Sequence, residues 1–286
     1  MKPAPFAYEA PQTLDEALAL LAAEGEDVKS LAGGQSLVPL LNFRLARPDR
    51  LVDLNGISEL AYLRRDGDVL RIGALARSAE LARSADAEAG WPLLVEAALL
   101  VGHPQIRARG TVCGSVAHAD PAAELPVALA AFEARFHIRS ARGARTLSAG
   151  ELFLSFFRTA LEPDELLVEI EVAALPPRTG GAFVEHARTH GDFALAGAAA
   201  VVSLDESGSC ADVRLALLAA GPAPVRAGVA ESLLAGSRPE PDAVEAAADA
   251  ATRDLELIGD DAEWRRALLR ELARQALVTA AGRAAA

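Results

Sequence analysis

Two glycine-rich segments hold the residues of this 286-residue chain that are best suited to bind an anion. The first, Ala32-Gly33-Gly34-Gln35-Ser36-Leu37, follows a short apolar stretch. Glycines permit positive φ, so consecutive backbone N–H groups can converge on one concavity, and the start of a helix adds partial positive charge. The segment matches neither GxGxxG nor a Walker A loop. It predicts either a pyrophosphate-binding loop or a plain turn in which Ser36 caps a helix.

The second segment, Gly110–Pro121, is a run of mostly small residues that ends in Asp120-Pro121, a pattern typical of a helix start. Small side chains let the backbone approach a ligand closely. Asp120 or Glu124 is suited to accept hydrogen bonds from ribose hydroxyls, as acidic residues do in dinucleotide sites. Two alternatives stay open at this point: Asp120 as a plain helix cap, and His118 as a packed or surface histidine.

Cysteine and histidine offer little further chemistry. Cys113 and Cys210 are the only cysteines, and neither belongs to a CxxC pair. This excludes a disulfide framework and a zinc or iron–sulfur site held by cysteines of this chain. His186 and His190 are four residues apart, but Gly191-Asp192 follows at once, which disfavours a continuing helix. We therefore expect no metal site.

The composition is that of a globular protein of about two domains, at roughly 150 residues per domain. Hydrophobic residues make up 51% of the chain, which is enough for a core and excludes disorder. The net charge of −12 argues against nucleic acid as the main partner. No stretch reaches the ~18 apolar residues of a membrane helix, and the N-terminus has no signal-peptide pattern. We expect a soluble, cytoplasmic protein without a membrane span.

The first glycine-rich segment lies within a predicted β-α-β unit. Thr13-Leu14-Asp15-Glu16 matches a capping box, and the apolar residues after it recur at helical spacing up to Leu21. A second capping box at Ser148–Glu151 precedes a helix that we expect to reach Phe157. The other elements expected in this part of the chain are strands at 28–32, 51–54, 69–72 and 166–172 and helices at 37–45, 78–85 and 92–100.

Pro176-Pro177 punctuates the chain and marks the expected domain boundary. Three strands followed by three helices are expected after it, which makes a compact α+β unit. The strands are expected at 181–188, 197–205 and 210–220, and the helices at 229–234, 242–255 and 262–279.

The two glycine-rich segments, read within Ala32–Pro48 and Gly102–Pro126, resemble the FAD-binding medium subunits of the molybdenum hydroxylases. These are the flavoprotein subunits of the carbon monoxide dehydrogenase and xanthine dehydrogenase family. Arg158–Val172, Phe183–Ala199 and Asp260–Leu277 look like later landmarks of that family, in the expected order. The resemblance covers nearly the whole chain.

The resemblance implies an α+β fold of two domains. Residues 1–177 would form a two-lobed FAD-binding domain of the vanillyl-alcohol-oxidase (PCMH) type, with lobes at about 1–55 and 56–177. Residues 178–286 would form a small α+β C-terminal domain, with a three-stranded antiparallel sheet plus helices.

The resemblance also implies which residues hold FAD, bound without a covalent link. The two glycine-rich segments would hold the pyrophosphate, Ala117 and His118 would lie near the cofactor, and Glu124 would contact the ribose or adenine. Val101 and Leu167 match positions that line the flavin or adenine pocket, although ordinary core packing explains them equally well. The full set is Leu31, Ala32, Gly33, Gly34, Gln35, Ser36, Leu37, Val101, Gly110, Thr111, Gly114, Ser115, Ala117, His118, Glu124 and Leu167.

Some positions depart from the family pattern. Cys113 stands where the family usually has a glycine, and its Cβ disfavours positive φ, so we expect this half of the site to be tighter or shifted. The lysine that the family often places near the flavin is absent, and Val184 and Glu185 stand there instead. Arg188 and Asp192 match a polar pair of the C-terminal domain.

No catalytic acid, base or nucleophile set accompanies the glycine-rich segments, so the cofactor would carry the chemistry. The resemblance implies an oxidoreductase subunit that takes electrons from a [2Fe–2S] partner subunit and passes them to an external acceptor. The molybdenum cofactor would lie on a large partner subunit, in a heterotrimer that is often doubled. The alternatives are a free-standing FAD-dependent oxidoreductase of the same fold, with its own substrate pocket, and a non-catalytic nucleotide-binding module.

Overall fold

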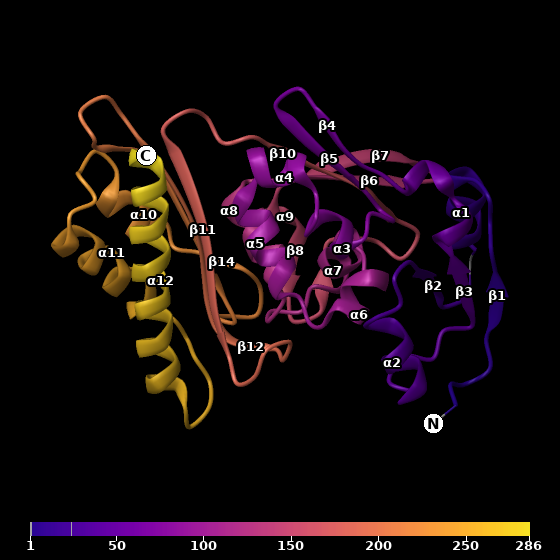
Figure 1. The fold of residues 1–286 in the computed structure, drawn as a ribbon. Helices are drawn as coiled ribbons and strands as arrows, with labels where there is room; N and C mark the ends of the chain where they lie inside the picture. The colour runs from indigo at the N-terminus through magenta and orange to yellow at the C-terminus, as the bar shows by residue number, and fades with distance from the viewer. Residues whose placement is uncertain (1, 24) are drawn as a thin grey trace.

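The computed structural model describes residues 2–23 and 25–286. Its N-terminal lobe contains a three-stranded parallel sheet in the order β1-β3-β2, at the right of Figure 1. Thr13 and Glu16 form the predicted capping box, since each side chain accepts a hydrogen bond from the other residue's N–H. The predicted β-α-β unit is confirmed. The elements are β1 (Ala7–Glu9), α1 (Leu14–Leu21), β2 (Val28–Leu31), α2 (Leu37–Asn42) and β3 (Arg50–Asp53), then 3-10 turns at Leu54–Gly56 and Ser58–Leu60.

The second lobe contains a five-stranded antiparallel sheet in the order β4-β5-β10-β6-β7. Along β10, Ile170 and Val172 are buried, whereas Glu169 and Glu171 are partly exposed on the opposite face. This alternation is that of a sheet with one covered face, and α7 packs against β5 and β10. The strands are β4 (Leu63–Asp66), β5 (Val69–Gly73), β6 (Arg135–Ser140), β7 (Gly143–Leu147) and β10 (Leu166–Ala173).

Short helices fill the space between this sheet and the C-terminal part of the chain (Figure 1). The helix expected at 78–85 is divided in two, because the Ser84 hydroxyl accepts a hydrogen bond from the Ala87 N–H and starts a new helix. The helices are α3 (Ser78–Leu81), α4 (Ala85–Gly90), α5 (Pro92–Leu100), α6 (Pro104–Arg109), α7 (Val112–His118), α8 (Glu124–Ala131) and α9 (Ala149–Leu152).

The prediction of a helix that reaches Phe157 is wrong. Ser148 and Glu151 form the capping box, but α9 ends at Leu152. The chain continues as β8 (Phe153–Ser155), which pairs with β9 (Arg158–Thr159). A capping box marks where a helix begins and not how long it is, and a short apolar run fits a strand as well as a helix.

The C-terminal sheet has four strands, so the prediction of a three-stranded sheet is wrong. The additional strand, β14 (Val225–Arg226), pairs with Ala216 and Leu217. It has two residues, too few to show the alternation that indicates a strand, and it directly follows a Gly-Pro-Ala-Pro turn. The other elements are β11 (Thr179–Ala187), β12 (Ala194–Leu204), β13 (Cys210–Leu218), α10 (Gly228–Leu234), α11 (Pro241–Arg253) and α12 (Ala262–Ala285).

Helices cover both faces of the C-terminal sheet, as Figure 1 shows. The long helix α12 packs against β11 and β12 on one face, and α5 and α8 of the preceding lobe pack on the other. Small residues permit a close approach: a Cβ on Gly180 would lie 2.1 Å from the carbonyl oxygen of Ala280 in α12. The last third of the chain is therefore joined to the second lobe by a shared hydrophobic core.

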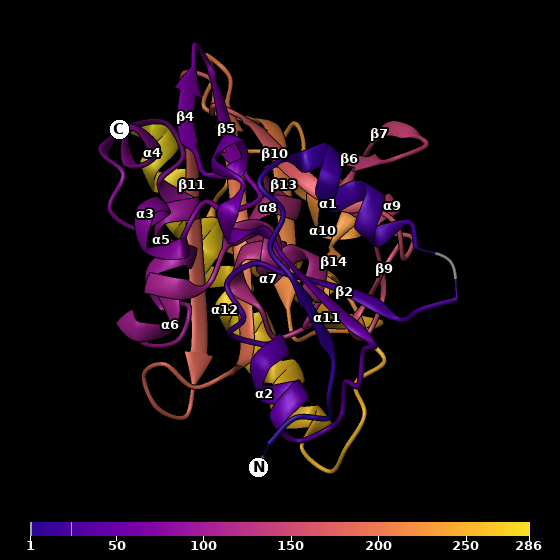
Figure 2. The same cartoon turned by 90° about the vertical axis from the view of Figure 1, so that its right-hand side faces the viewer.

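The N-terminal lobe lies at the opposite end of the molecule from α12. Figure 2 brings α1 and α2 to the front, with the C-terminal sheet behind them. Among the described residues, no helix is both long enough and apolar enough to cross a membrane.

Candidate functional site

The first glycine-rich segment connects the end of β2 to the start of α2 and presents unpaired backbone donors. Gly34 has φ of +73°, the left-handed conformation that favours glycine. Within the part of the chain that the structure describes, the N–H groups of Gly33, Gly34, Gln35 and Ser36 have no hydrogen-bond acceptor. Ser36 precedes α2, but its hydroxyl makes no capping hydrogen bond. A segment of free donors suits an anion better than it suits a plain capped turn.

Most of the second segment is helical, since α7 runs from Val112 to His118. Gly110 and Thr111 form the turn between α6 and α7, and the Thr111 hydroxyl accepts a hydrogen bond of 3.0 Å from the Gly114 N–H. Cys113 lies within the first turn of α7, so it needs no positive φ. Its thiol is buried and contacts the carbonyl oxygen of Ile72 at 3.7 Å. The Cβ of Cys113 therefore gives no reason for this half of the site to be tighter or shifted.

The fold brings the two segments into backbone contact at Gly33. A Cβ on Gly33 would lie 2.5 Å from the Arg109 carbonyl oxygen, 2.7 Å from the Gly110 Cα and 3.0 Å from the Thr111 nitrogen. Real Cβ atoms do not approach backbone this closely, so only glycine fits here. The Gln35 side chain donates to the Gly33 carbonyl at 3.3 Å and lies next to Gly110. The free N–H groups of the first segment thus lie beside the first turn of α7.

Two buried carboxyl groups lie where this site meets the C-terminal sheet. Glu124, the first residue of α8, is only 7% exposed, and burial raises its pKa to about 8, with a smaller contribution from the negative charge of Glu185. Burial likewise raises the pKa of Glu185, in β11, to about 7, and its Oε2 has no hydrogen-bond partner among the described residues. Asp120 accepts a hydrogen bond from the Ala122 N–H, so it closes a turn and does not cap α8.

Other predicted residues lie on α7, at the end of α5 and in β10. His118 ends α7, where its ring lies 5.2 Å from that of Phe157 and burial lowers its pKa. Ala117 is exposed on the same helix. Val101 lies at the end of α5, and its carbonyl accepts a hydrogen bond from Arg107. Leu167 is buried in β10, the strand that packs against α7, and belongs to the core.

Other polar groups lie apart from this site. His186 neighbours Trp264 and His190 neighbours His103, so the two histidines do not face a common ligand. Arg188 and Asp192 form an ion pair at 3.9 Å. His137, Glu169 and Glu171 lie together on the open face of the second sheet, where Arg71 Nη1 already bonds both carboxylates at 2.8 and 3.0 Å.

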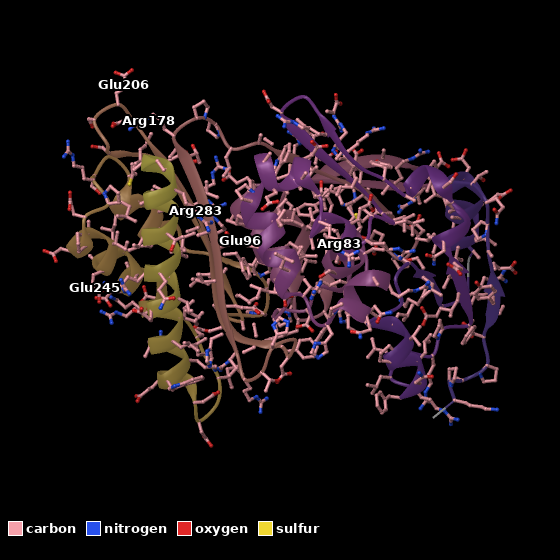
Figure 3. The ribbon with its side chains drawn as sticks, in the orientation of Figure 1. Arg83, Glu96, Arg178, Glu206, Glu245 and Arg283 are labelled. Carbon is pink, nitrogen blue, oxygen red and sulfur yellow. The ribbon has the colours of Figure 1, made fainter. Side chains whose placement is uncertain are left out.

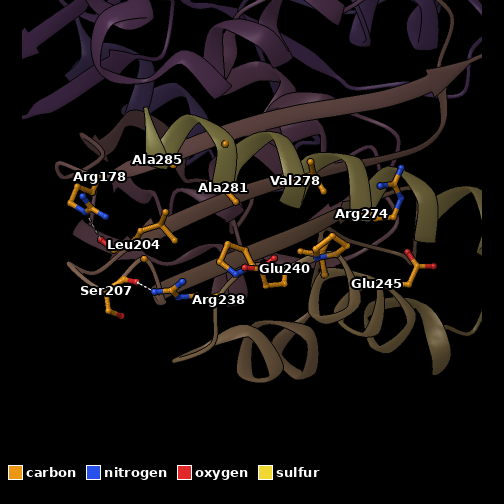
Figure 4. A pocket seen from close by; sticks show the side chains of 15 residues that line it. Arg178, Leu204, Ser207, Arg238, Glu240, Glu245, Arg274, Val278, Ala281 and Ala285 are labelled. Carbon is orange, nitrogen blue, oxygen red and sulfur yellow. Dashed lines mark hydrogen bonds between the residues drawn. The ribbon is translucent and has the colours of Figure 1, made fainter.

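A cavity of about 650 Å³ lies between α12, the β12–β13 turn and the start of α11, as Figure 4 shows. Its arginines are already engaged: Arg178 donates to the Leu204 carbonyl and Arg238 to the Ser207 carbonyl. All the residues that line it belong to the C-terminal part of the chain, so it is separate from the glycine-rich segments.

The chain matches two known protein families along its length. Residues 4–175 match the FAD binding domain in molybdopterin dehydrogenase, and residues 181–280 match the CO dehydrogenase flavoprotein C-terminal domain. The chain belongs to the FAD-binding subunits of the molybdenum hydroxylases. FAD is therefore the cofactor of its first domain, and the subunit is part of the oxidoreductase class of enzymes.

Relatives and solved structures of this FAD-binding subunit align over nearly all of it. It is 44% identical to the 6-hydroxypseudooxynicotine dehydrogenase complex subunit alpha of Paenarthrobacter nicotinovorans, over 99% of this chain and 97% of the relative. It superposes with a TM-score of 0.95 and 40% identity on carbon monoxide dehydrogenase from Hydrogenophaga pseudoflava, over 99% of both chains. Quinoline 2-oxidoreductase from Pseudomonas putida 86 gives a TM-score of 0.93 at 35% identity, again over 99% of both chains.

The geometry of the site fits FAD. The free N–H groups at Gly33–Ser36 and the contact at Gly33 suit a pyrophosphate, whose oxygens accept hydrogen bonds from backbone donors.

Sequence reasoning missed three residues next to the site: Asn55, Arg77 and Phe157. Their contacts join distant parts of the chain, and no local spacing could have indicated them.

Proposed function

We propose that this chain is an electron-transfer subunit, which takes electrons from a [2Fe–2S] partner subunit and passes them to an external acceptor. FAD, when bound, supplies the ability to accept electrons singly and to release them in pairs. With only Cys113 and Cys210, the chain cannot ligate an iron–sulfur cluster through cysteines, so the cluster belongs on another subunit. The relative from Paenarthrobacter nicotinovorans is named as a subunit of a dehydrogenase complex, which supports this division of labour.

We propose that FAD is held without a covalent bond by the sixteen residues that the sequence analysis predicts. The observation that carries this assignment is the run of unpaired N–H groups at Gly33–Ser36 beside the first turn of α7. Thr111 adds a further free N–H, because it makes no backbone hydrogen bond as a donor among the described residues. The chain's contribution is therefore to bind the pyrophosphate and to orient the rest of the cofactor toward Glu124 and His118.

We propose a heterotrimer with a large molybdenum-cofactor subunit and a small [2Fe–2S] subunit. The domain boundary near residue 177, the PCMH-type architecture of the first domain and the cytoplasmic location also stay proposals. Purification of the untagged complex from its native host, followed by an absorption spectrum and a subunit gel, tests the assembly. Flavin and iron–sulfur absorbance with two co-purifying chains is expected. A yellow protein without partners, reduced directly by small organic substrates, would favour a free-standing oxidoreductase.

The FAD site itself is tested by Gly33→Ala in the isolated chain. The new Cβ would meet three backbone atoms of residues 109–111 within 3.0 Å, so the two segments must separate. We expect FAD affinity to fall at least ~100-fold, since the donors no longer share one anion. The control is Gly282→Ala in α12, where a Cβ meets no atom within 4 Å. Unchanged affinity in Gly33→Ala would refute the assignment.

A further inference from the structure

The side chain of Arg77 connects the two glycine-rich segments. Its Nη1 donates a hydrogen bond of 2.7 Å to the carbonyl oxygen of Arg109, and its Nη2 donates one of 2.6 Å to Oδ1 of Asn55. The Nδ2 of Asn55 donates in turn to the carbonyl oxygen of Ala32, at 2.9 Å. One guanidinium and one amide thereby link the backbone just before Gly33 to the backbone just before Gly110.

The backbone of Arg77 is itself fixed against the second segment. The Ser78 N–H donates to the Gly110 carbonyl at 2.9 Å, and the Val112 N–H donates to the Ala76 carbonyl at 3.1 Å. Between these bonds, Arg77 and Thr111 form an isolated antiparallel bridge. The side chain thus leaves from a rigid position and extends toward the first segment.

Asn55 is also held in place by hydrogen bonds to Asp53. Oδ1 of Asp53 accepts hydrogen bonds from the backbone N–H of Asn55, at 3.0 Å, and from its Nδ2, at 2.6 Å. The hydroxyl of Tyr8 donates to Oδ2 of the same carboxylate. Asn55 therefore presents a fixed acceptor to Arg77 and a fixed donor to Ala32. Because Arg77 and Asn55 are each held by further hydrogen bonds, the distance between the segments depends on this chain of bonds.

We propose that Arg77 is a positioning residue that, through Asn55, sets the spacing between the two FAD-binding segments. The inference rests on the proposed role of those segments in holding FAD. A planar guanidinium suits this task, since its donors meet two acceptors in a fixed geometry, whereas a lysine ammonium is a compact point charge on a flexible stem. Without the link, the free segments sample other spacings, and the apparent affinity falls with the fraction that is competent to bind.

The first test measures FAD binding to the full chain by flavin fluorescence. Arg77→Met should weaken binding by about 10- to 100-fold, the usual effect of losing hydrogen bonds from a charged donor. The matched control is Arg83→Met, which removes the same charge just after α3. The Arg83 side chain, labelled in Figure 3, is exposed and forms no hydrogen bond or ion pair among the described residues. This control should bind FAD within about twofold of the parent chain.

Chemical rescue separates positioning from a general loss of structure. Ethylguanidinium should restore much of the FAD affinity of Arg77→Ala, while ethylammonium at equal concentration should not, because only the guanidinium bridges both acceptors. Asn55→Asp gives a second test that does not alter Arg77: it keeps an acceptor for the guanidinium but loses the donor to Ala32, so it should also weaken FAD binding.

Each result has one meaning. Parent-like affinity in Arg77→Met, or equal rescue by the two cations, would overturn the positioning role. Should Arg77→Ala fail to fold, Asn55→Asp decides alone, and parent-like binding there overturns the proposal. If Gly33→Ala binds FAD normally, the proposed site itself is wrong. If Gly33→Ala loses FAD while Arg77→Met keeps it, the site stands and only the role of Arg77 falls.

Discussion

Ala119 and Phe157 both adopt left-handed backbone conformations, with φ of 51° and 53°, and the Phe157 N–H donates a hydrogen bond of 3.0 Å to the Ala119 carbonyl. The left-handed region costs a residue with a Cβ about 1–2 kcal/mol. Ala119 ends α7 and Phe157 lies in the turn between β8 and β9, so the bond fixes this exposed aromatic residue beside His118. Strained residues of this kind concentrate at functional sites, and this pair adjoins α7, the helix that Thr111 caps.

Ala119→Gly should stabilise the chain because glycine adopts the left-handed region without steric cost. Its greater freedom in the unfolded chain offsets part of the gain, which leaves about 0.5–1 kcal/mol. Thermal and urea unfolding of the apoprotein measure the change. The control is Ala246→Gly, at an exposed position within α11, which should destabilise the chain by about 1 kcal/mol. A loss of stability in both variants would contradict the assigned strain at Ala119.

The buried carboxyls of Glu124 and Glu185 should make stability depend on pH. Burial raises their pKa values to about 8 and about 7, from 4.5 in the absence of the fold. Between pH 4.5 and 8 these two carboxyl groups therefore bind more protons in the folded chain than in the unfolded chain. The contribution of these two groups to the free energy of unfolding falls as pH rises through this window and levels off above it.

Glu185→Gln tests this pH dependence, because glutamine fills the same space without titrating. We expect the variant to lose less stability than the parent chain between about pH 5 and 8, and to be the more stable of the two at about pH 8. Urea unfolding at a series of pH values measures both quantities. Glu206→Gln, at an exposed position in the β12–β13 turn, should leave the pH profile unchanged. Identical slopes for Glu185→Gln and the parent would show that Glu185 does not titrate differently on folding.

Local sequence patterns predicted local structure in this chain and little beyond it. Thr13 and Ser148 start helices as their capping boxes indicate, since both partners of a capping box lie within one turn. The small residues of Gly110–Pro121 gave no indication of a helix before Asp120, yet Thr111 caps one there through the Gly114 N–H. The β-pairing that shortens α9 depends on residues in a later segment. Helix length was therefore the least predictable feature.

The backbone donors of the candidate site were predictable from the sequence, but the side chains that hold the two segments together were not. Gly33, Gly34 and Ser36 were identifiable because glycine pairs and helix starts have known chemistry. Arg77 was not, because its two acceptors, Arg109 and Asn55, lie more than twenty residues away on either side and meet it only in the folded chain. The oxygen of Glu185 that lacks a hydrogen-bond partner was likewise not identifiable from the sequence, because only the folded chain determines which atoms surround it. Only tertiary structure creates such relationships.

Glu96 joins the second lobe to the C-terminal sheet, and its removal should be costly. Its Oε2 accepts a hydrogen bond of 2.9 Å from the N–H of the buried Phe183. Its Oε1 forms an ion pair of 2.6 Å with Arg283 of α12, and Figure 3 labels Glu96 and Arg283. Glu96→Ala leaves the Phe183 N–H unpaired, which costs about 1–3 kcal/mol.

Glu96→Gln separates the hydrogen bond from the charge. Glutamine can still accept from the Phe183 N–H, and the ion pair is half-exposed, so this variant should lose less than about 1 kcal/mol. Glu271→Gln, which removes the exposed ion pair with Arg274, is the control and should lose about 0.5 kcal/mol or less. Urea unfolding ranks the three variants. Equal losses for Glu96→Ala and Glu96→Gln would show that the charge, and not the hydrogen bond, joins the two parts.

Cys113 lies in the first turn of α7 beside the proposed FAD site, yet it should neither bond the flavin nor react with thiol reagents. The side chain is 3% exposed and contacts the Ile72 carbonyl, and burial raises the pKa of the thiol. The thiolate is the reactive form, so a buried thiol with a raised pKa is inert. Cys210 is also buried, and burial raises its pKa as well.

Two measurements test whether Cys113 is unreactive and unbonded to the flavin. In the native chain a disulfide reagent should titrate almost no thiol within minutes, whereas in the denatured chain it should titrate both cysteines. The positive control is Ala246→Cys, at an exposed position on α11, whose thiol should react at once. Acid precipitation of the FAD-loaded chain should leave all the flavin in solution, because a covalent link would need the thiolate that burial suppresses. Flavin that stays with the precipitate would show that a covalent bond forms despite this environment, and its loss in Cys113→Ser would then identify the bonded sulfur.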